Sequence, residues 1–187
     1  MEQSEILQLI EKLTTASKRE ARRISAKLEN GEIDVDEWKA AILALLVSSH
    51  IIAASVGRGG RSAMTSGDWQ KVQDKVAWQG GFLDKLGAKI ASGAIVVAAG
   101  VIAARAVKYF AAPFVSFANA DKERAVEASP KDEKEMLCLR ELHAAESCPD
   151  CQAYADLGWI PVSEQPEIGS LQCGDYCRCE ISFEDEV

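Results

Sequence analysis

Cysteine is absent from the first 137 residues of this 187-residue chain, and basic residues are scarce in its last third. Residues 131–187 contain 4 Lys and Arg against 14 Asp and Glu, whereas residues 1–130 contain 17 against 15. Nucleic-acid phosphates are bound by clustered Lys and Arg, so this balance argues against a general nucleic-acid-binding protein. The basic segment 18–27 is a local exception. It is interpreted first as a solvated helix face, with contact to nucleic acid or an acidic partner as the alternative.

Catalytic motifs are also missing. The chain has two histidines and no H-E-x-x-H motif, nucleophile elbow or P-loop, since the Gly-rich segment 57–62 lacks the Gly-Lys-Ser/Thr ending. His50 lies in the apolar stretch "VSSHIIA" and is expected to be a core or interface residue rather than a general base. His143 is expected on a helix surface, with metal ligation as the weaker option. The sequence therefore indicates a protein that is not an enzyme.

The uncharged run of residues 90–104 is too short for an ordinary membrane span. This run has fifteen residues, whereas a spanning helix needs roughly 20. Its Ala- and Gly-rich composition favours close helix packing in a bundle or an oligomer over contact with a membrane. The acidic, amphipathic start "MEQSEILQLIEK" does not have the pattern of a secretory signal, which predicts synthesis inside the cell.

The patterns that are present predict a mainly α-helical protein. Apolar residues at helical spacing and Gly or Pro breaks divide residues 1–130 into several helices, which form an elongated body. Residues 131–187 follow as an acidic, Cys-rich module of loops and short β-strands, preceded by a solvated linker at 127–135. Helices are expected over 4–28, 38–55, from Thr65 or Ser66 to Gly80-Gly81, over 82–124 with a kink or end at Pro113, and over 132–146.

Six cysteines lie between positions 138 and 179, and five of them form a C-x2-C pair followed by C-x3-C-x-C. Thiolates at such spacing converge on one tetrahedral ion, as in zinc ribbons and knuckles, so a structural zinc is expected. Disulfides among the same cysteines are the main alternative, and inert burial is the other. Cys138 is expected to be buried apart from the site. The candidate metal ligands are Cys148 and Cys151, then Cys173 and Cys177, with Cys179 able to replace either of the last two.

The string "RELHAAESCPDCQAYADLGWIPVSEQPEIGSLQCGDYCRCEISFED" resembles the carboxyl end of tailed-phage minor head proteins, the phage Mu F-like head-morphogenesis family. The matching elements are the "CPDC" pair, the "GWIPV" turn, the "PEIGS" segment and the terminal "CRC" before a strand-like end. Many members have a histidine before the final cysteine pair. Here Cys173 lies in that neighbourhood, which preserves a possible metal ligand.

This resemblance implies a virion component that is made in the host cytoplasm and acts in the phage head during prohead assembly. The implied partners are head proteins, namely the portal, the major capsid protein or an adaptor, together with further copies of the chain. The prediction is thus a structural minor head protein. It docks on portal, capsid or sister subunits through its helices and through the module of residues 131–187, which a metal or disulfides cross-link. The alternative is a phage protein that contacts the genome through segment 18–27 or a membrane through an apolar helix at 90–104.

Overall fold

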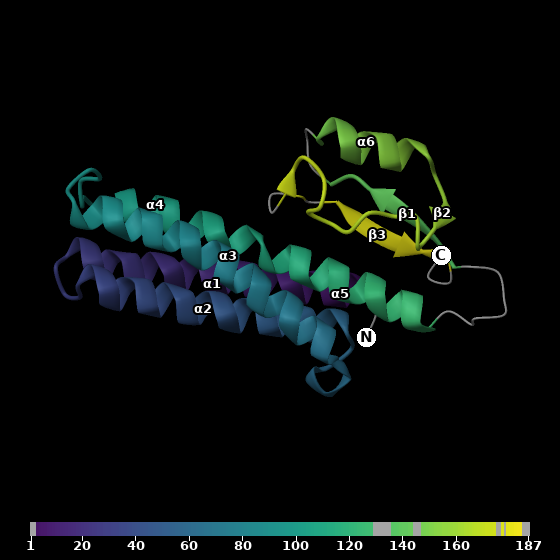
Figure 1. Ribbon diagram of the computed structural model, residues 1–187, viewed down its shortest axis with the longest axis horizontal. Helices are drawn as coiled ribbons and strands as arrows, with labels where there is room; N and C mark the ends of the chain where they lie inside the picture. Colours follow the sequence, from purple (N-terminus) through teal and green to yellow (C-terminus); the bar gives the residue numbers. More distant parts are fainter. Residues whose placement is uncertain (1–2, 129–135, 144–146, 175–176, 178, 185–187) are drawn as a thin grey trace. The chain divides into compact units, whose positions relative to one another are not determined.

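The computed structural model describes residues 3–128, 136–143, 147–174, 177 and 179–184. The mainly helical fold with a small, Cys-rich sheet module is confirmed (Figure 1). The elements are α1 (Gln3–Glu29), α2 (Val35–Gly57), the 3-10 helix η1 (Arg61–Ala63), α3 (Ser66–Ala91), α4 (Val101–Ala106), the 3-10 helix η2 (Val107–Ala111), α5 (Pro113–Ala128), β1 (Leu137–Glu141), α6 (Pro149–Asp156), β2 (Ile160–Pro161) and β3 (Glu180–Phe183).

The chain forms two compact units. The first, here called the helical unit, comprises Met1–Ala53 and Thr65–Pro113. The second, here called the carboxyl-terminal unit, comprises Ala54–Met64 and Phe114–Val187. The domain boundary that the sequence predicts between residues 130 and 131 lies outside the described residues.

The helical unit is built around a core of fully buried apolar side chains. Trp38 is central: its side chain is buried and its indole Nε1 donates a hydrogen bond to Ser25 Oγ at 3.1 Å. A reciprocal bond pair between Asp34 and Glu37 begins α2, because each backbone N–H donates to the other residue's carboxylate, at 3.0 and 2.8 Å. The surrounding core includes Ala21, Ile42, Leu46, Leu83, Ile102, Ala106 and Phe110.

The third helix is longer than the sequence predicts. Thr65 caps it as expected, in a capping box with Asp68, but the expected end at Gly80-Gly81 is wrong because α3 continues to Ala91. A glycine inside a helix lowers the stability of the helix by only about 1 kcal/mol relative to alanine. The buried face of α3 keeps its helical spacing across the glycines, and this packing outweighs that cost. The buried side chains of this face include Val72, Gln79, Leu83, Leu86 and Ile90.

The predicted apolar helix at 90–104 is also wrong. The polypeptide turns after α3, and Gly93 and Gly100 adopt φ values of +73° and +81° that L side chains rarely take. Val96 on this turn is 74% exposed. The membrane-contacting alternative therefore loses the helix on which it depended. The break predicted at Pro113 is confirmed, since α5 begins there.

Two other helical stretches meet the length and composition of a membrane span, Val35–Gly57 and Val101–Ala128. Core helices of soluble proteins pass the same test. Trp38 and Ile42 in the first stretch and Phe110 in the second are fully buried in the protein core, as apolar residues of a core helix are.

The carboxyl-terminal unit contains a three-stranded antiparallel sheet in the order β2-β1-β3. The predicted helix at 132–146 is wrong, because residues 137–141 form the central strand. Cys138 and Arg140 on β1 are buried and pair with Phe183 and Ile181 of β3. This pairing spans about 40 residues of sequence, so the local pattern does not reveal it. Helix α6 packs on β1 (Figure 1).

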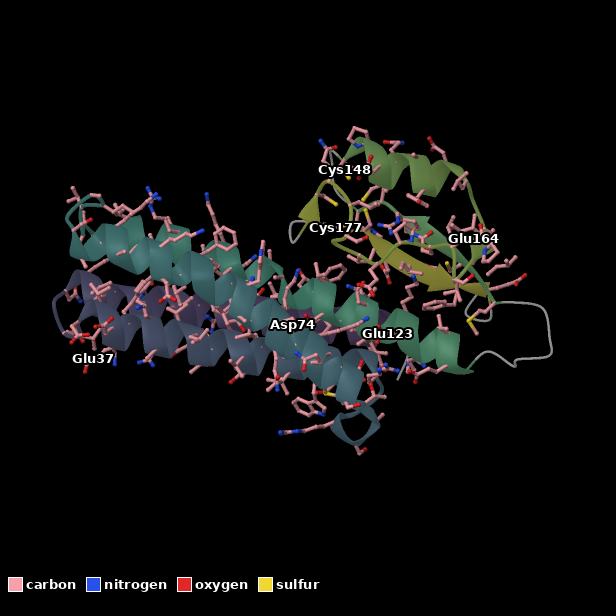
Figure 2. The ribbon with its side chains drawn as sticks, viewed as in Figure 1. Glu37, Asp74, Glu123, Cys148, Glu164 and Cys177 are labelled. Atoms are coloured by element: carbon pink, nitrogen blue, oxygen red, sulfur yellow. The ribbon has the colours of Figure 1, made fainter. Side chains whose placement is uncertain are left out.

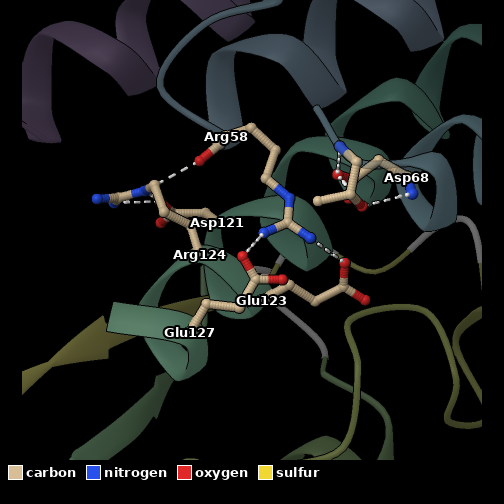
Figure 3. A network of polar contacts seen from close by, with 8 residues as sticks. Arg58, Asp68, Asp121, Glu123, Arg124 and Glu127 are labelled. Atoms are coloured by element: carbon tan, nitrogen blue, oxygen red, sulfur yellow. Dashed lines mark hydrogen bonds and ion pairs between the residues drawn. The ribbon is translucent and has the colours of Figure 1, made fainter. Parts of the chain in front are cut away.

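Helix α5 holds the loop that leads into the second cysteine group. The Asn119 side chain bonds both backbone groups of Ile168, accepting from its N–H at 2.7 Å and donating to its C=O at 3.0 Å. Lys122 Nζ donates to the Gln165 carbonyl. The end of α2 joins the same unit through Arg58, which is 5% exposed and contacts Glu123 and Glu127 at 3.0 and 2.7 Å (Figure 3).

Candidate metal centre

Three segments bring five cysteines together. Cys148 is the N-cap of α6 and Cys151 lies in its first turn. Cys173 ends the loop held by α5, and Cys177 and Cys179 lead directly into β3. In Figure 2 the labelled Cys148 and Cys177 lie at the same end of the carboxyl-terminal unit. The region between the two groups contains α6, the two-residue strand β2 and turns, in place of the two short strands or extended loop expected.

The thiols are spaced for a metal rather than for disulfides. Cys151 Sγ lies 3.4 Å from Cys173 Sγ and 3.9 Å from Cys177 Sγ, and all six cysteines are free. Zn–S bonds of about 2.3 Å would place the sulfurs of a tetrahedral site about 3.8 Å apart. A disulfide would need about 2.05 Å. The five predicted ligands therefore form a cluster that could hold a metal ion.

The cluster consists of two triads that share Cys151. The sulfurs of Cys148, Cys151 and Cys173 lie within 4.8 Å of one another, and so do those of Cys151, Cys177 and Cys179. Cys151, Cys177 and Cys179 are 0%, 1% and 2% exposed. A site this enclosed is typical of structural rather than catalytic metal centres, which keep an open coordination position.

The sequence "CPDC" creates the first half of the site by local geometry. Pro149 occupies the first turn of α6, where its missing N–H leaves no bond unmade. The Cys151 N–H then donates to Cys148 Sγ at 3.4 Å. Asp150 faces the second half, since its carboxylate accepts a hydrogen bond from the Gln172 backbone N–H at 3.3 Å. A two-residue spacing thus places both sulfurs at the start of a helix, where negative charge is favoured.

The thiols differ in their ease of ionisation. Burial raises the pKa of Cys148 and Cys177, but hydrogen bonds from neighbouring cysteines more than offset it, so both pKa values are lowered. Burial raises the pKa of Cys151 and Cys173, and it raises the pKa of Cys179 to about 12. The apo cluster therefore resists full ionisation. A bound divalent cation would supply the positive charge that lets four thiolates coexist.

Sequence reasoning missed Arg140, which lies beside this cluster. Its guanidinium is 1% exposed, and Nη1 donates to Cys151 Sγ at 3.6 Å. Nη2 donates to the Pro166 carbonyl at 2.6 Å. The one available signal was its rarity, since only 4 Lys and Arg occur in residues 131–187.

Three other residues that the sequence singled out lie outside the cluster. Cys138 is fully buried, as predicted, but it lies on the strand β1 and not on a helix. His143 is half exposed and its Nε2 lies 3.0 Å from a Glu180 carboxylate oxygen, which agrees with a surface position, although it follows a strand and not a helix. His50 is a buried core residue as predicted, and its Nε2 hydrogen-bonds Gln79 Oε1 at 2.9 Å.

The basic segment 18–27 lies on α1 in the helical unit. Arg22 and Arg23 are exposed, and Arg23 forms an ion pair with Glu20 of the same helix at 2.6 Å. This agrees with a solvated helix face.

Comparisons of the chain with models of known protein families, with curated proteins and with solved structures find no match.

Proposed function

We propose that the carboxyl-terminal unit is folded around one structural zinc ion and that the chain is an assembly protein rather than an enzyme. The observation that carries this proposal is the convergence of five thiols on the buried Cys151. The ion takes Cys148, Cys151, Cys173 and Cys177, and Cys179 is the fifth thiol, able to replace either of the last two. When bound, the zinc cross-links the start of α6 to the segment that leads into β3.

Zinc suits this site for chemical reasons. Thiolate ligands select soft or borderline metals, and four thiolates in a tetrahedral arrangement are typical of structural zinc. Neither described histidine joins the cluster, so no neighbouring imidazole is placed to act as a general base. The arrangement therefore favours a structural zinc that cross-links the chain over a catalytic zinc.

The small sheet of the carboxyl-terminal unit also needs a cross-link of this kind for its stability. Its sheet has strands of two to five residues, and few large apolar side chains are buried around it, including Val162, Ile168, Ile181 and Phe183, together with Val115 and Phe117 of α5. Small modules with so little core usually depend on metals or disulfides for stability. A metal that joins residues far apart in sequence supplies what the core lacks.

Hydrogen exchange tests the zinc cross-link. With the zinc-bound protein as reference, EDTA is expected to remove protection from the amides of β1 and β3 and to leave those of α1 to α3 protected. Added zinc should restore the protection. Equal protection of β1 and β3 with and without EDTA, in a protein shown to have lost its zinc, would contradict the proposal.

For the biological role we propose a minor head protein of a tailed phage, which docks on portal, capsid or sister subunits during head assembly. The resemblance of residues 140–185 to that family supports this role, and so does apolar surface on the helical unit. Trp78 and Phe82 are 54% and 42% exposed, with ring centroids 4.7 Å apart. A groove of about 560 Å³ lies between α2 and α3, lined by residues that include Leu43, Val47, Ile51, Trp69, Val72 and Val76.

This role is tested by producing the chain together with the portal and major capsid proteins of its phage. The chain is expected to sediment with proheads and to be present in the mature particle. The variant Trp78→Ala together with Phe82→Ala should weaken this association, whereas exposed Leu157→Ala in the other unit serves as the control. A chain that remains free of head particles would contradict the role.

A further inference from the structure

Arg140 is a buried cation without a carboxylate partner among the residues that the structure describes. Its side chain is 1% exposed, and its described partners are the Cys151 sulfur, the Pro166 carbonyl, the Gln165 side chain and the Tyr154 ring. Burying a guanidinium without a compensating negative charge is strongly unfavourable. Among the described groups that contact Arg140, the Cys151 sulfur is the one that would become an anion, as a thiolate bound to a metal ion.

The other contacts hold the guanidinium in position. With its amide oxygen turned toward Arg140, Gln165 accepts from Nε and Nη2 at 2.5 and 2.8 Å, and Gln165 is itself 1% exposed. The carbonyl of Pro166 accepts from Nη2 at 2.6 Å, and the Tyr154 ring centroid lies 5.9 Å from Cζ. Hydrogen bonds thus hold Nε and Nη2 of the planar guanidinium in place, which leaves Nη1 directed at the Cys151 sulfur.

We infer that Arg140 is the counter-ion of the metal–thiolate centre, an inference that rests on the zinc site proposed above. Four thiolates and one Zn²⁺ carry a net charge of −2, and a buried site of that charge is stabilised by a nearby cation. Arg140 reduces this charge through Cys151, the sulfur that both triads share. Because Arg140 lies on β1, the same contact couples metal binding to the docking of the central strand.

Two variants separate charge from packing. Arg140→Met keeps an apolar stem but removes the charge and the N–H donors, whereas Arg140→Lys keeps the charge. Arg140→Met is expected to lower zinc affinity about 10- to 100-fold in a chelator competition, as the loss of groups that support metal ligands does. Arg140→Lys is expected to retain zinc with a smaller loss.

Cobalt substitution provides a readout that a merely structural role would not move. In the Co²⁺ form, a cation beside Cys151 stabilises its sulfur lone pairs and raises the energy of the thiolate-to-metal charge-transfer band. Arg140→Met should therefore shift this band to longer wavelength, and Arg140→Lys should keep it near the wild-type position. The matched control is Cys138→Ala on the same buried face of β1. It should lower stability and leave the band unchanged.

The outcomes distinguish this inference from the zinc proposal. Wild-type protein that takes up neither zinc nor cobalt overturns the metal site itself. Wild-type protein that binds zinc, with Arg140→Met equal in affinity and band position, overturns only the role of Arg140. If Arg140→Met does not fold, Arg140→Lys decides: retained zinc with the wild-type band supports the counter-ion, and loss of zinc from a folded chain contradicts it.

Discussion

At the scale of single residues, the five clustered cysteines are not equivalent. Cys151 is fully buried, belongs to both thiol triads and accepts a hydrogen bond from Arg140. Cys148 and Cys173 belong to the first triad and are partly exposed, and Cys179 belongs only to the second. The loss of one thiol should therefore have very different consequences at different positions.

Cys151→Ser is expected to abolish zinc binding, because it removes the sulfur that both thiol triads share. Cys179→Ser should still bind about one zinc per chain through the other four thiols, with affinity reduced by less than about 10-fold. The zinc content of the purified, dialysed variants measures both effects. Normal zinc in Cys151→Ser would contradict the arrangement around the shared sulfur.

The buried thiol of Cys138 gives a pH-dependent prediction. Burial raises its pKa from the ordinary value of 9.0 to about 11, although Lys122 and Arg140 lower it in part. The folded-state pKa lies above the unfolded one, so the stabilising contribution is complete below pH 9 and is lost as the pH rises through 11. This group should contribute a loss of roughly 2–3 kcal/mol over that range.

Urea denaturation of zinc-loaded protein between pH 8 and pH 12 measures this loss. Cys138→Ala should be less stable at pH 8 but should lose stability less steeply toward alkaline pH. Parallel pH dependences for the two proteins would show that Cys138 ionises normally in the folded chain.

At the scale of elements, packing decides whether a glycine in a helix can be replaced by alanine. Gly57 is closely surrounded by other atoms, whereas Gly81 is open to solvent. A Cβ on Gly57 would lie 2.4 Å from the Phe117 carbonyl oxygen and 2.9 Å from the Asp121 nitrogen. The end of α2 thus approaches the backbone of α5 in a way that only glycine allows. A Cβ on exposed Gly81 of α3 would meet nothing within 4 Å.

Gly57→Ala is therefore expected to lower the free energy of unfolding by about 2–3 kcal/mol, since backbone atoms cannot move aside as flexible side chains do. Gly81→Ala should raise it by roughly 0.5–1 kcal/mol, because alanine favours the helix. Chemical denaturation compares the two variants. A destabilising Gly81→Ala would indicate that α3 does end near that glycine.

The start of α4 depends on a carboxylate from another helix. Glu29 of α1 accepts hydrogen bonds from the backbone N–H groups of Gly100, Ile102 and Ala103 at 2.8, 2.8 and 3.1 Å. Removal of this cap in Glu29→Ala should cost about 1–2 kcal/mol of unfolding free energy. Glu32→Ala, at an exposed position nearby, should change stability by less than about 0.5 kcal/mol. Equal effects of the two variants on the urea midpoint would contradict the capping role.

Local sequence patterns predicted those elements whose cause is local. The two long helices of residues 4–28 and 38–55 follow from apolar spacing, and Thr65 was readable as a cap. The cysteine spacing predicted the cluster, since C-x2-C at a helix start places two sulfurs together by itself. These features need no knowledge of distant contacts.

Features set by distant contacts were not predicted. Residues 137–141 become a strand because β3 pairs with them, and their buried positions hold Cys and Arg rather than the apolar alternation that marks a strand. Arg140 was not predicted for the same reason. Its role depends on the Cys151 sulfur, which helix α6 positions. The apolar run at 90–104 was misread because Gly93 and Gly100 permit a turn that composition alone does not reveal.

At the scale of the whole molecule, the chain combines two units that are stabilised in different ways. The helical unit contains a continuous apolar core, whereas the carboxyl-terminal unit combines a short sheet with a thiol cluster. Removal of a metal should therefore act on one unit and spare the other.

Chelation is expected to separate the two units in a thermal scan. In excess EDTA with reductant, the transition of the carboxyl-terminal unit should fall by roughly 15 °C or more, because a ligand at 1,000 times its Kd contributes about 4 kcal/mol. The far-UV helical signal should melt near its original temperature. A uniform shift of both transitions would show that the metal stabilises the chain as a whole.

The proposed zinc site requires that the cysteine cluster holds a metal ion with its thiols reduced. The most direct measurement is the mass of the intact, native protein purified without chelator, combined with a count of titratable thiols after denaturation in EDTA. We expect about one zinc per chain and six titratable thiols. A metal-free chain with few titratable thiols would contradict it, because the same cysteines would then be joined as disulfides.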